Sequence, residues 1–234
     1  MKLLAIDASA GAASACVWEE GKVLGENYIN TRLTHSQTLM PMIDGVVQYT
    51  KIPLSEIDGF AVSAGPGSFT GVRIAVSSIK GIAMATGKPC VSVSTLEAMA
   101  QNLLVLPCTA CCVMDARCGQ VYNALFSIED GKVRRLCEDR ALSIKELAEE
   151  CAGLSEPLVL VGDGAQLCAK SPEFMEINAC LSPEPIQYQR ASGVARVAAE
   201  KFLRGETVTA GELQPIYLRS PQAERNLRLK NKRV

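Results

Sequence analysis

The chain has 234 residues, of which 48% are hydrophobic and 21% charged, so it can fold into one large or two small domains and is not a disordered chain. Its net charge of −1 gives the whole molecule no strong preference for nucleic acid or anionic surfaces. Asp7 stands where a signal peptide would need its apolar stretch, and no apolar run approaches the ~20 residues that span a bilayer. We therefore expect a soluble, cytoplasmic protein.

Apolar runs and turn residues in the first half predict an antiparallel meander of three strands, followed by alternating helices and strands. Thr34, His35 and Ser36 are candidate N-caps of the first helix, and Gly87 ends the second. Pro41 is expected in or near the first turn of its helix, where a missing N–H costs little. The predicted strands are 3–6, 13–18, 23–24, 60–63 and 90–93, and the predicted helices are 36–51, 70–86 and 95–104.

The second half begins again with three short strands and continues with strand–helix units. Ser143 and Glu146 have the spacing of a capping box at the start of a helix. The coarse internal repeat predicts an α/β fold of two tandem domains, with a break near Pro107. The predicted strands here are 108–114, 120–126, 132–136 and 158–161, and a late helix is predicted at 192–203. We assign 1–105 with helix 192–204 to the first domain, and 106–191 with 205–224 to the second.

The positive charges are concentrated at the end of the chain. Residues 225–234 hold five of the 24 lysines and arginines and no acidic residue, which leaves 19 cations against 25 acidic residues in the first 224. This basic tail could contact RNA phosphates or an acidic partner. The alternative, which we favour, is a solvated tail without a partner.

The segment 65–71 is rich in glycine and precedes a predicted helix. Gly65 and Gly67 permit close backbone approach, while Ser68 and Thr70 lie at the helix start, where free N–H groups favour anions. A phosphate or an RNA backbone could sit there, with Arg73 one turn into the helix. A tight strand-to-helix turn with hydroxyl caps explains the same residues equally well. The segment is not a P-loop, because no Gly-Lys-Ser/Thr sequence follows.

Acidic and glycine residues also end three predicted strands. Asp7 and Ser9 follow the first strand, Asp115 takes the analogous place in the second half, and Gly162 and Gly164 end a later strand. An acid at the end of a strand in an α/β sheet is a candidate for a magnesium–phosphate site. In order and placement these segments resemble the two phosphate loops and the adenosine loop of actin-like ATPases. The alternative is ordinary strand-ending turns, in which Asp and Gly are common.

Ten cysteines are many for this length, but a reducing compartment favours thiols that act as small apolar core residues. Cys108 and Cys111 have CxxC spacing, yet residues three apart on a strand point to opposite faces, so we predict no metal site. His35 is the only histidine, which excludes an HExxH zinc centre. We expect His35 to cap or pack at the start of its helix.

The two helices 36–51 and 70–86 carry broad apolar faces. The second is apolar around much of its circumference, which indicates burial on more than one side, either by a covering domain or by another subunit. Their candidate contact residues are Leu39, Met42, Ile43, Val46, Val72, Arg73, Val76, Ile79 and Ala83.

These residues resemble the TsaB family, also called YeaZ. The similarity lies in segments 35–43, 65–73, 80–83, 115–117, 121–122 and 215–219, in the right order along almost the whole chain. The glycine segment 65–71 with the Arg73 that follows is specific to this family and its catalytic paralogue. The resemblance implies two actin-like domains of the ASKHA, ribonuclease H-like class.

The resemblance also implies a function. Members of the family associate with the catalytic subunit TsaD and the small ATPase TsaE, in an assembly that transfers a threonylcarbamoyl group to the adenosine next to the anticodon of tRNA. They also form homodimers through the helices matching 36–51 and 70–86. We therefore expect a non-catalytic partner subunit with no catalytic residue of its own.

The loops depart from the ATPase pattern, because Ala8 and Ala116 stand where glycines are usual, which hinders close approach of phosphate. We expect no tightly bound cofactor and at most weak ATP or ADP binding. The main alternative is an independent ATP-using enzyme in which Asp7 and Asp115 hold the magnesium nucleotide. A glycoprotease-type peptidase is a weaker alternative, because the chain lacks a recognisable zinc site or nucleophile–base pair.

Overall fold

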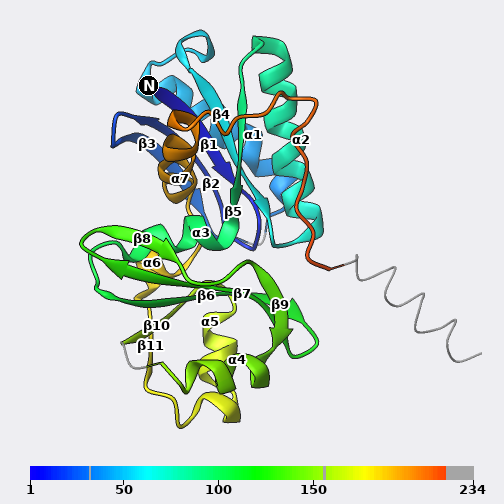
Figure 1. Cartoon of the computed structure of the whole chain (residues 1–234). Helices are drawn as coiled ribbons and strands as arrows, with labels where there is room; N and C mark the ends of the chain where they lie inside the picture. The colour runs from blue at the N-terminus through cyan, green and yellow to red at the C-terminus, as the bar shows by residue number, and fades with distance from the viewer. Residues whose placement is uncertain (32, 155–156, 220–234) are drawn as a thin grey trace, which may run out of the picture.

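The computed structural model describes residues 1–31, 33–154 and 157–219. The chain forms two lobes, one above the other in Figure 1, each built on its own sheet. The first sheet has the strand order β3-β2-β1-β4-β5, and the second has the order β11-β10-β6-β7-β8, with β9 also paired to β7. The basic tail predicted at 225–234 lies outside the described residues.

The first lobe confirms the predicted order of elements. The strands β1, β2 and β3 form an antiparallel meander, while β4 and β5 add in parallel beside β1. The elements are β1 Lys2–Asp7, β2 Ala13–Glu19, β3 Lys22–Ile29, α1 His35–Thr50, η1 Leu54–Glu56, β4 Gly59–Gly65, α2 Phe69–Thr86, β5 Cys90–Ser94, α3 Thr95–Ala100 and η2 Gln101–Leu103.

The second lobe repeats the meander and then diverges. The capping box is present, since Ser143 Oγ accepts from the Glu146 amide and the Glu146 carboxylate accepts from the Ser143 amide. Strand β9 was not predicted, because its four residues run directly into a helix without an apolar alternation. The elements are β6 Cys108–Arg117, β7 Gln120–Glu129, β8 Lys132–Arg135, β9 Arg140–Ser143, α4 Ile144–Cys151, β10 Leu158–Val161, α5 Ala165–Ala169, η3 Pro172–Phe174, β11 Ala179–Leu181, α6 Glu184–Gln187 and α7 Ala191–Leu203.

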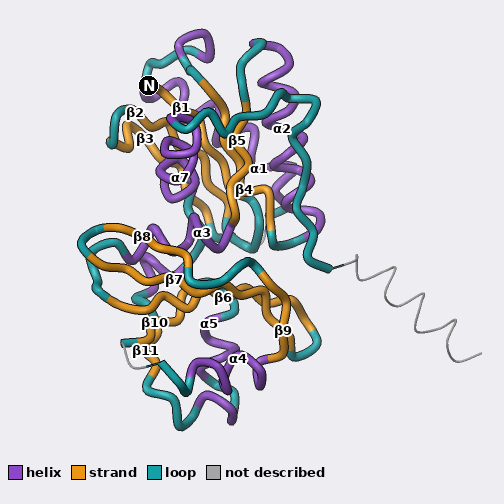
Figure 2. Tube along the Cα trace, viewed as in Figure 1, coloured by secondary structure: helices purple, strands orange, loops and turns teal. Residues whose placement is uncertain are grey.

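Helices cover both faces of the first sheet, as Figure 2 shows in purple against the orange strands. The helices α1 and α2 pack on one face, around Phe60 and Ile79. On the other face α7 packs against residues of β1, β2, β4 and β5. None of the helices in the described part of the chain is long and apolar enough to cross a bilayer.

The apolar residues predicted to contact a partner lie in the protein's own core, so this prediction was wrong for their side chains. Each helix turns its stripe towards the sheet, and Ile74 and Ile82 pack at the edge of the same cluster, which explains the wide apolar surface of α2. Arg73 alone is exposed. The buried residues, with at most 7% exposure, are Leu39, Met42, Ile43, Val46, Val72, Val76, Ile79 and Ala83.

Two further local predictions need correction. Helix α1 begins at His35, so Pro41 falls in the second turn rather than the first. Thr34 occupies the N-cap position, but its side chain makes no capping hydrogen bond there. By contrast, Ser68 caps α2, as the capped-turn alternative for segment 65–71 predicted, because its hydroxyl accepts from the Gly71 amide.

The segment after α7 lies on the first lobe, so the assignment of 205–224 to the second domain was wrong for its described residues. Val208 exchanges two backbone hydrogen bonds with Cys90, at 2.8 and 2.9 Å, and Leu213 is buried against the first sheet. The Ile216 amide then donates to the Ala64 carbonyl at 2.7 Å. We call residues 205–219 the strap; Figure 1 shows it in orange and red, running beside α2.

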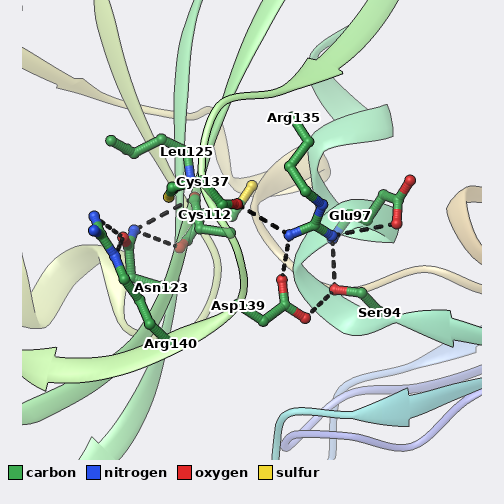
Figure 3. Close-up of polar contacts among 10 residues, drawn as sticks. Ser94, Glu97, Cys112, Asn123, Leu125, Arg135, Cys137, Asp139 and Arg140 are labelled. Carbon is green, nitrogen blue, oxygen red and sulfur yellow. Dashed lines mark hydrogen bonds and ion pairs between the residues drawn. The ribbon is translucent and has the colours of Figure 1, made fainter.

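A polar network joins the two lobes at α3. The helix lies between the lobes (Figure 1), and Figure 3 shows the side chains of the network. Ser94 Oγ donates to Asp139 Oδ2 at 2.5 Å. The guanidinium of Arg135 donates to Asp139 at 2.6 Å and to Glu97 at 3.3 Å. Because Ser94 and Glu97 belong to the end of the first half and Arg135 and Asp139 to the second, this network fixes how the lobes sit against each other.

Candidate functional site

A cleft of about 540 Å³ opens between the lobes. Loops of the first lobe, the ends of β6 and β10 in the second, and the end of the strap all contribute to its walls. The cleft brings together Ser9, Gly67, Ser68, Thr70 and Asp115 of the predicted site. It also includes five residues that were not among the predicted site residues: Arg117, Tyr122, Asp163, Tyr217 and Arg219.

Asp7 is not part of the cleft surface. Its carboxylate has no exposed area and accepts hydrogen bonds from the Ser63 hydroxyl and from both the amide and the hydroxyl of Ser9, at 2.9 and 2.8 Å. Burial raises the pKa of Asp7, while the hydrogen bonds from Ser63 and Ser9 oppose that rise. Because its oxygens are used inside the lobe, Asp7 positions the loop after β1 rather than facing a ligand.

The glycine segment is packed against that same loop. The Ser68 amide donates to the Ser9 carbonyl at 2.6 Å. A Cβ at Gly67 would lie 2.4 Å from the Ser9 carbonyl oxygen, and one at Gly71 would lie 2.0 Å from that of Ala8. Gly67 and Gly71 are therefore explained by contact of the chain with itself, between the start of α2 and the loop after β1.

Gly65, Gly162 and Gly164 also serve backbone packing. Gly65 has a φ of +129° and lies against the Ile216 carbonyl of the strap, while Gly162 has a φ of +115° and lies against the Val113 carbonyl. A Cβ at Gly164 would approach the backbone of Met114 at 2.9 Å. None of these three glycines lines the cleft. Asp163, which lies between Gly162 and Gly164 in the sequence, does line it.

The second lobe brings charged side chains of both signs to the cleft. Asp115 pairs with Arg117 at 3.0 Å and accepts from the Arg117 amide at 2.7 Å. Asp163 accepts from Gln189 Nε2 at 3.3 Å. The two carboxylates are close enough for Asp115 to raise the pKa of Asp163. The arrangement can offer a guanidinium and carboxylates to a polar ligand, but Arg117 and Asp115 already neutralise each other in part.

The strap closes one side of the cleft. Tyr217 stacks on Phe69 at 4.9 Å between ring centroids, and Arg73 lies over the same Phe69 ring at 4.7 Å. Arg219 Nη1 donates to the Ala116 carbonyl of the second lobe at 2.7 Å. Sequence periodicity could not find these contacts, because the strap contains no helix or strand; the similarity in 215–219 was the one sequence indication.

The stability of the protein should depend on the protonation of Asp163. Burial raises its pKa from the usual 3.8 to about 6, the Gln189 hydrogen bond opposes this, and the Asp115 carboxylate adds to it. Because the folded pKa lies above the unfolded one, the folded state binds the extra proton and stability rises as pH falls from about 6 towards 4. This rise in the pKa of Asp163 corresponds to a change in the free energy of unfolding of at most roughly 3 kcal/mol.

We therefore expect Asp163→Asn to be more stable than the unmodified protein at neutral pH and to lose that advantage as pH falls through the window. The asparagine amide oxygen can still accept from Gln189, so the hydrogen bond is kept. Urea unfolding at several pH values measures the difference. A constant difference across the pH range would contradict this account. Asp44→Asn, at an exposed position of α1, is the matched control.

Cysteine and histidine take the structural places expected of them. Seven cysteines are buried, and Cys108 and Cys111 belong to core clusters on opposite faces of the second sheet, as predicted. His35 is the first residue of α1, and its Nε2 donates to the Ala10 carbonyl at 2.6 Å. In the described ranges, no three His, Cys, Asp or Glu side chains are grouped so that they could hold a metal ion.

Sequence comparison finds relatives along the whole chain. The family model of TsaD, tRNA N6-adenosine threonylcarbamoyltransferase, matches residues 23–227. The Escherichia coli tRNA threonylcarbamoyladenosine biosynthesis protein TsaB is 31% identical over 231 residues, which cover 97% of this chain and 98% of that protein. The match therefore includes both lobes and the strap.

Solved structures agree. A Pseudomonas aeruginosa protein described as similar to the peptidase YeaZ superposes with a TM-score of 0.81 at 29% identity, over 93% of this chain and 99% of that one. Component A of (R)-2-hydroxyglutaryl-CoA dehydratase from Acidaminococcus fermentans has a TM-score of 0.51 at 12% identity, over 86% of this chain and 98% of that one. This second likeness concerns the fold alone, and it confirms the predicted actin-like α/β architecture.

Proposed function

Since this chain belongs to the TsaB (YeaZ) family, we propose that it is a non-catalytic partner subunit in the cytoplasmic synthesis of threonylcarbamoyladenosine in tRNA. In this proposal it binds and activates a TsaD-like catalytic subunit, which adds the threonylcarbamoyl group to the adenosine next to the anticodon. A TsaE-like ATPase joins the assembly, which binds tRNA as a complex. The chain also forms homodimers. The observation that carries the proposal is the match to Escherichia coli TsaB along 97% of the chain.

The outward sides of α1 and α2 support a docking role. Because the apolar stripes of these helices are buried in the core, a partner can contact only the exposed side chains. These include Met40, Tyr49 and Met84, which are 49%, 84% and 72% exposed. Large apolar and aromatic side chains in water are the type that dominates binding energy in protein interfaces. We propose that these positions replace the buried ones as the contact with the TsaD-like subunit.

We further propose that the interlobe cleft holds nucleotide weakly if at all. The enclosed carboxylate of Asp7 supports this, because both of its oxygens already accept hydrogen bonds. The contact between the glycine segment and the loop after β1 adds support, since Ser9 occupies the approach to Gly67. A catalytic role would need these groups to face the cleft.

Reconstitution of the tRNA modification tests the proposal. The TsaD-like and TsaE-like subunits, tRNA and substrates are combined with and without this chain. Threonylcarbamoyladenosine should form only when the chain is added, and the chain alone should form none. Full activity of the mixture without the chain would refute the subunit role, while product from the chain alone would refute the non-catalytic assignment.

A substitution on the outward side of α2 should weaken assembly without unfolding the protein. We expect Met84→Asp to lower the affinity for the TsaD-like subunit by at least about tenfold, because a carboxylate would be desolvated in an apolar contact. In size-exclusion chromatography the variant should therefore co-elute less with that subunit. Its circular dichroism should stay unchanged, since Met84 is exposed.

Met175→Asp provides the matched control, because Met175 is also exposed, at 75%, but lies in the second lobe. Equal loss of assembly in both variants would show that any added charge disturbs the complex. Unchanged assembly with Met84→Asp would place the contact elsewhere.

A further inference from the structure

The chain crosses between the two lobes twice, and the two crossings lie side by side. Residues 104–107 lead from the first lobe to the second, and residues 188–190 lead back to α7. Asn102 Nδ2 donates to the carbonyls of Ile186 and Tyr188, at 3.0 and 2.9 Å, and so ties the end of the first crossing to the start of the second. Helix α3 contacts η2 and α7 at the same place. Adjacent crossings of this kind form a hinge about which one lobe can rotate against the other.

The strap adds a third connection between the lobes, made by hydrogen bonds. The Ile216 amide donates to the Ala64 carbonyl of the first lobe at 2.7 Å. Three residues later, Arg219 Nη1 donates to the Ala116 carbonyl of the second lobe at 2.7 Å. All four residues of 216–219 line the cleft, whereas no residue of either crossing lines it. The strap therefore joins the lobes across the cleft, and the crossings join them away from it.

The second lobe presents the carbonyl that Arg219 contacts. The pairing of β6 with β7 passes from Asp115 to Arg117, so Ala116 is a bulge residue without a partner in the ladder. Arg117 has a φ of +66°, and the Asp115 carboxylate accepts from the Arg117 amide at 2.7 Å, which holds the bulge in this shape. The bulge thus leaves the Ala116 carbonyl to accept from the guanidinium of Arg219 instead of from β7.

The first lobe braces the strap at the start of α2. Tyr217 stacks on Phe69, the first residue of α2, at 4.9 Å between ring centroids. Arg73 lies over the same ring at 4.7 Å, so Phe69 is held between the strap and its own helix. A Cβ at Gly65 would clash with the Ile216 carbonyl, which shows that the strap packs directly on the end of β4. This side of the connection is therefore fixed to the first lobe by backbone and ring contacts.

We propose that residues 216–219 are a clasp that holds the interlobe cleft at one width, with Arg219 as the residue that closes it. When the contact between Arg219 and Ala116 is broken, the lobes rotate about the paired crossings and the cleft widens. The clasp does with a part of the chain what a bound ligand does in proteins whose two lobes close around it. It belongs to the chain itself, so it acts in the isolated protein as well as in an assembly.

The distance between the lobes tests the clasp directly. Spin labels are attached to cysteines introduced by Ser77→Cys on α2 and Glu149→Cys on α4, which are exposed positions in different lobes. The full chain is used, with the exposed or half-buried thiols of Cys118, Cys137 and Cys180 replaced by serine. Pulsed electron paramagnetic resonance then gives the distribution of distances between the two labels.

Arg219→Ala should shift this distribution to longer distances by more than about 2 Å, because the lobes lose their contact across the cleft. Arg219→Lys should keep most of the original distribution, since an ammonium group can still donate to the Ala116 carbonyl. Arg196→Ala removes an exposed arginine of α7 and is the matched control, with no shift expected. An unchanged distribution in Arg219→Ala would overturn the clasp, and an equal shift in Arg196→Ala would overturn the role of Arg219.

A second variant tests the brace on the first lobe. Tyr217→Ala leaves Arg219 in place but removes the stack on Phe69, so the label distances should lengthen here too. Hydrogen exchange at the Ile216 amide, which is bonded to the Ala64 carbonyl, should be at least about fivefold faster in this variant. Faster exchange without any change in the label distances would show that the strap had left the first lobe while the cleft kept its width, and this result would also overturn the proposal.

Discussion

Gly71→Ala should destabilise the protein by about 1–3 kcal/mol or more, although glycine-to-alanine changes inside helices normally stabilise. The added Cβ would lie 2.0 Å from the Ala8 carbonyl oxygen, a distance that forces the backbone of α2 or of the loop after β1 to move. Neither element can yield easily. Ala8 is fully buried, and Asp7 before it is held by three hydrogen bonds. Urea unfolding, with the midpoint and slope fitted, measures the change.

Gly81 on the same helix gives the control. A Cβ there meets nothing within 4 Å, so Gly81→Ala should stabilise by about 0.5–1 kcal/mol through the helix propensity of alanine alone. The two substitutions are chemically identical and lie within one helix, yet they should have opposite signs. The same sign for both would mean that the loop after β1 gives way more readily than its contacts indicate.

Ile79→Asp should prevent stable folding altogether. Ile79 has no exposed surface and packs between α2 and the first sheet, where an aspartate would lose the apolar contacts and have no partner for its charge. The combined cost is at least about 4 kcal/mol, which is comparable with the whole stability of many domains. Expression of the soluble protein and its circular dichroism report the outcome.

This result separates the core of α2 from its outer surface. Ile79→Val, which removes one methyl group, should cost only about 0.5–1.5 kcal/mol and keep assembly with the TsaD-like subunit intact. Met84→Asp, on the same helix, should fold normally and lose assembly. If Ile79→Asp instead folded well and only failed to assemble, Ile79 would belong to a partner surface rather than to the core.

The order of strands and helices was predictable because each element carries its own periodicity. The run 60–62 is continuously apolar and lies in β4, which is buried along its whole length, and the stripe of Val72, Val76 and Ile79 marks a helix. The same stripe could not say what covers it. Apolar residues facing a sheet and apolar residues facing a second subunit look alike in sequence, so the contact residues were assigned to the wrong surface.

The candidate site was predicted only in part, for a related reason. Ser9, Ser68 and Asp115 do meet in one cleft, because strand ends of the two lobes face each other. The role of Gly67 and Gly71 was open, since a ligand and a carbonyl of the chain itself both demand the missing Cβ. Tyr217 and Arg219 could not be placed, because a segment without periodic structure carries no indication of where it packs.

Helix α7 and the strap have a consequence for any attempt to dissect the molecule. The first lobe is discontinuous in sequence, since residues 191–219 return to it after the whole second lobe has been completed. A fragment that stops at residue 105 would leave the Ala5 and Val91 side of its sheet bare and β5 without its bridge to Val208. Only the second lobe, which is inserted in the sequence between the two parts of the first, could be excised as a single piece of chain.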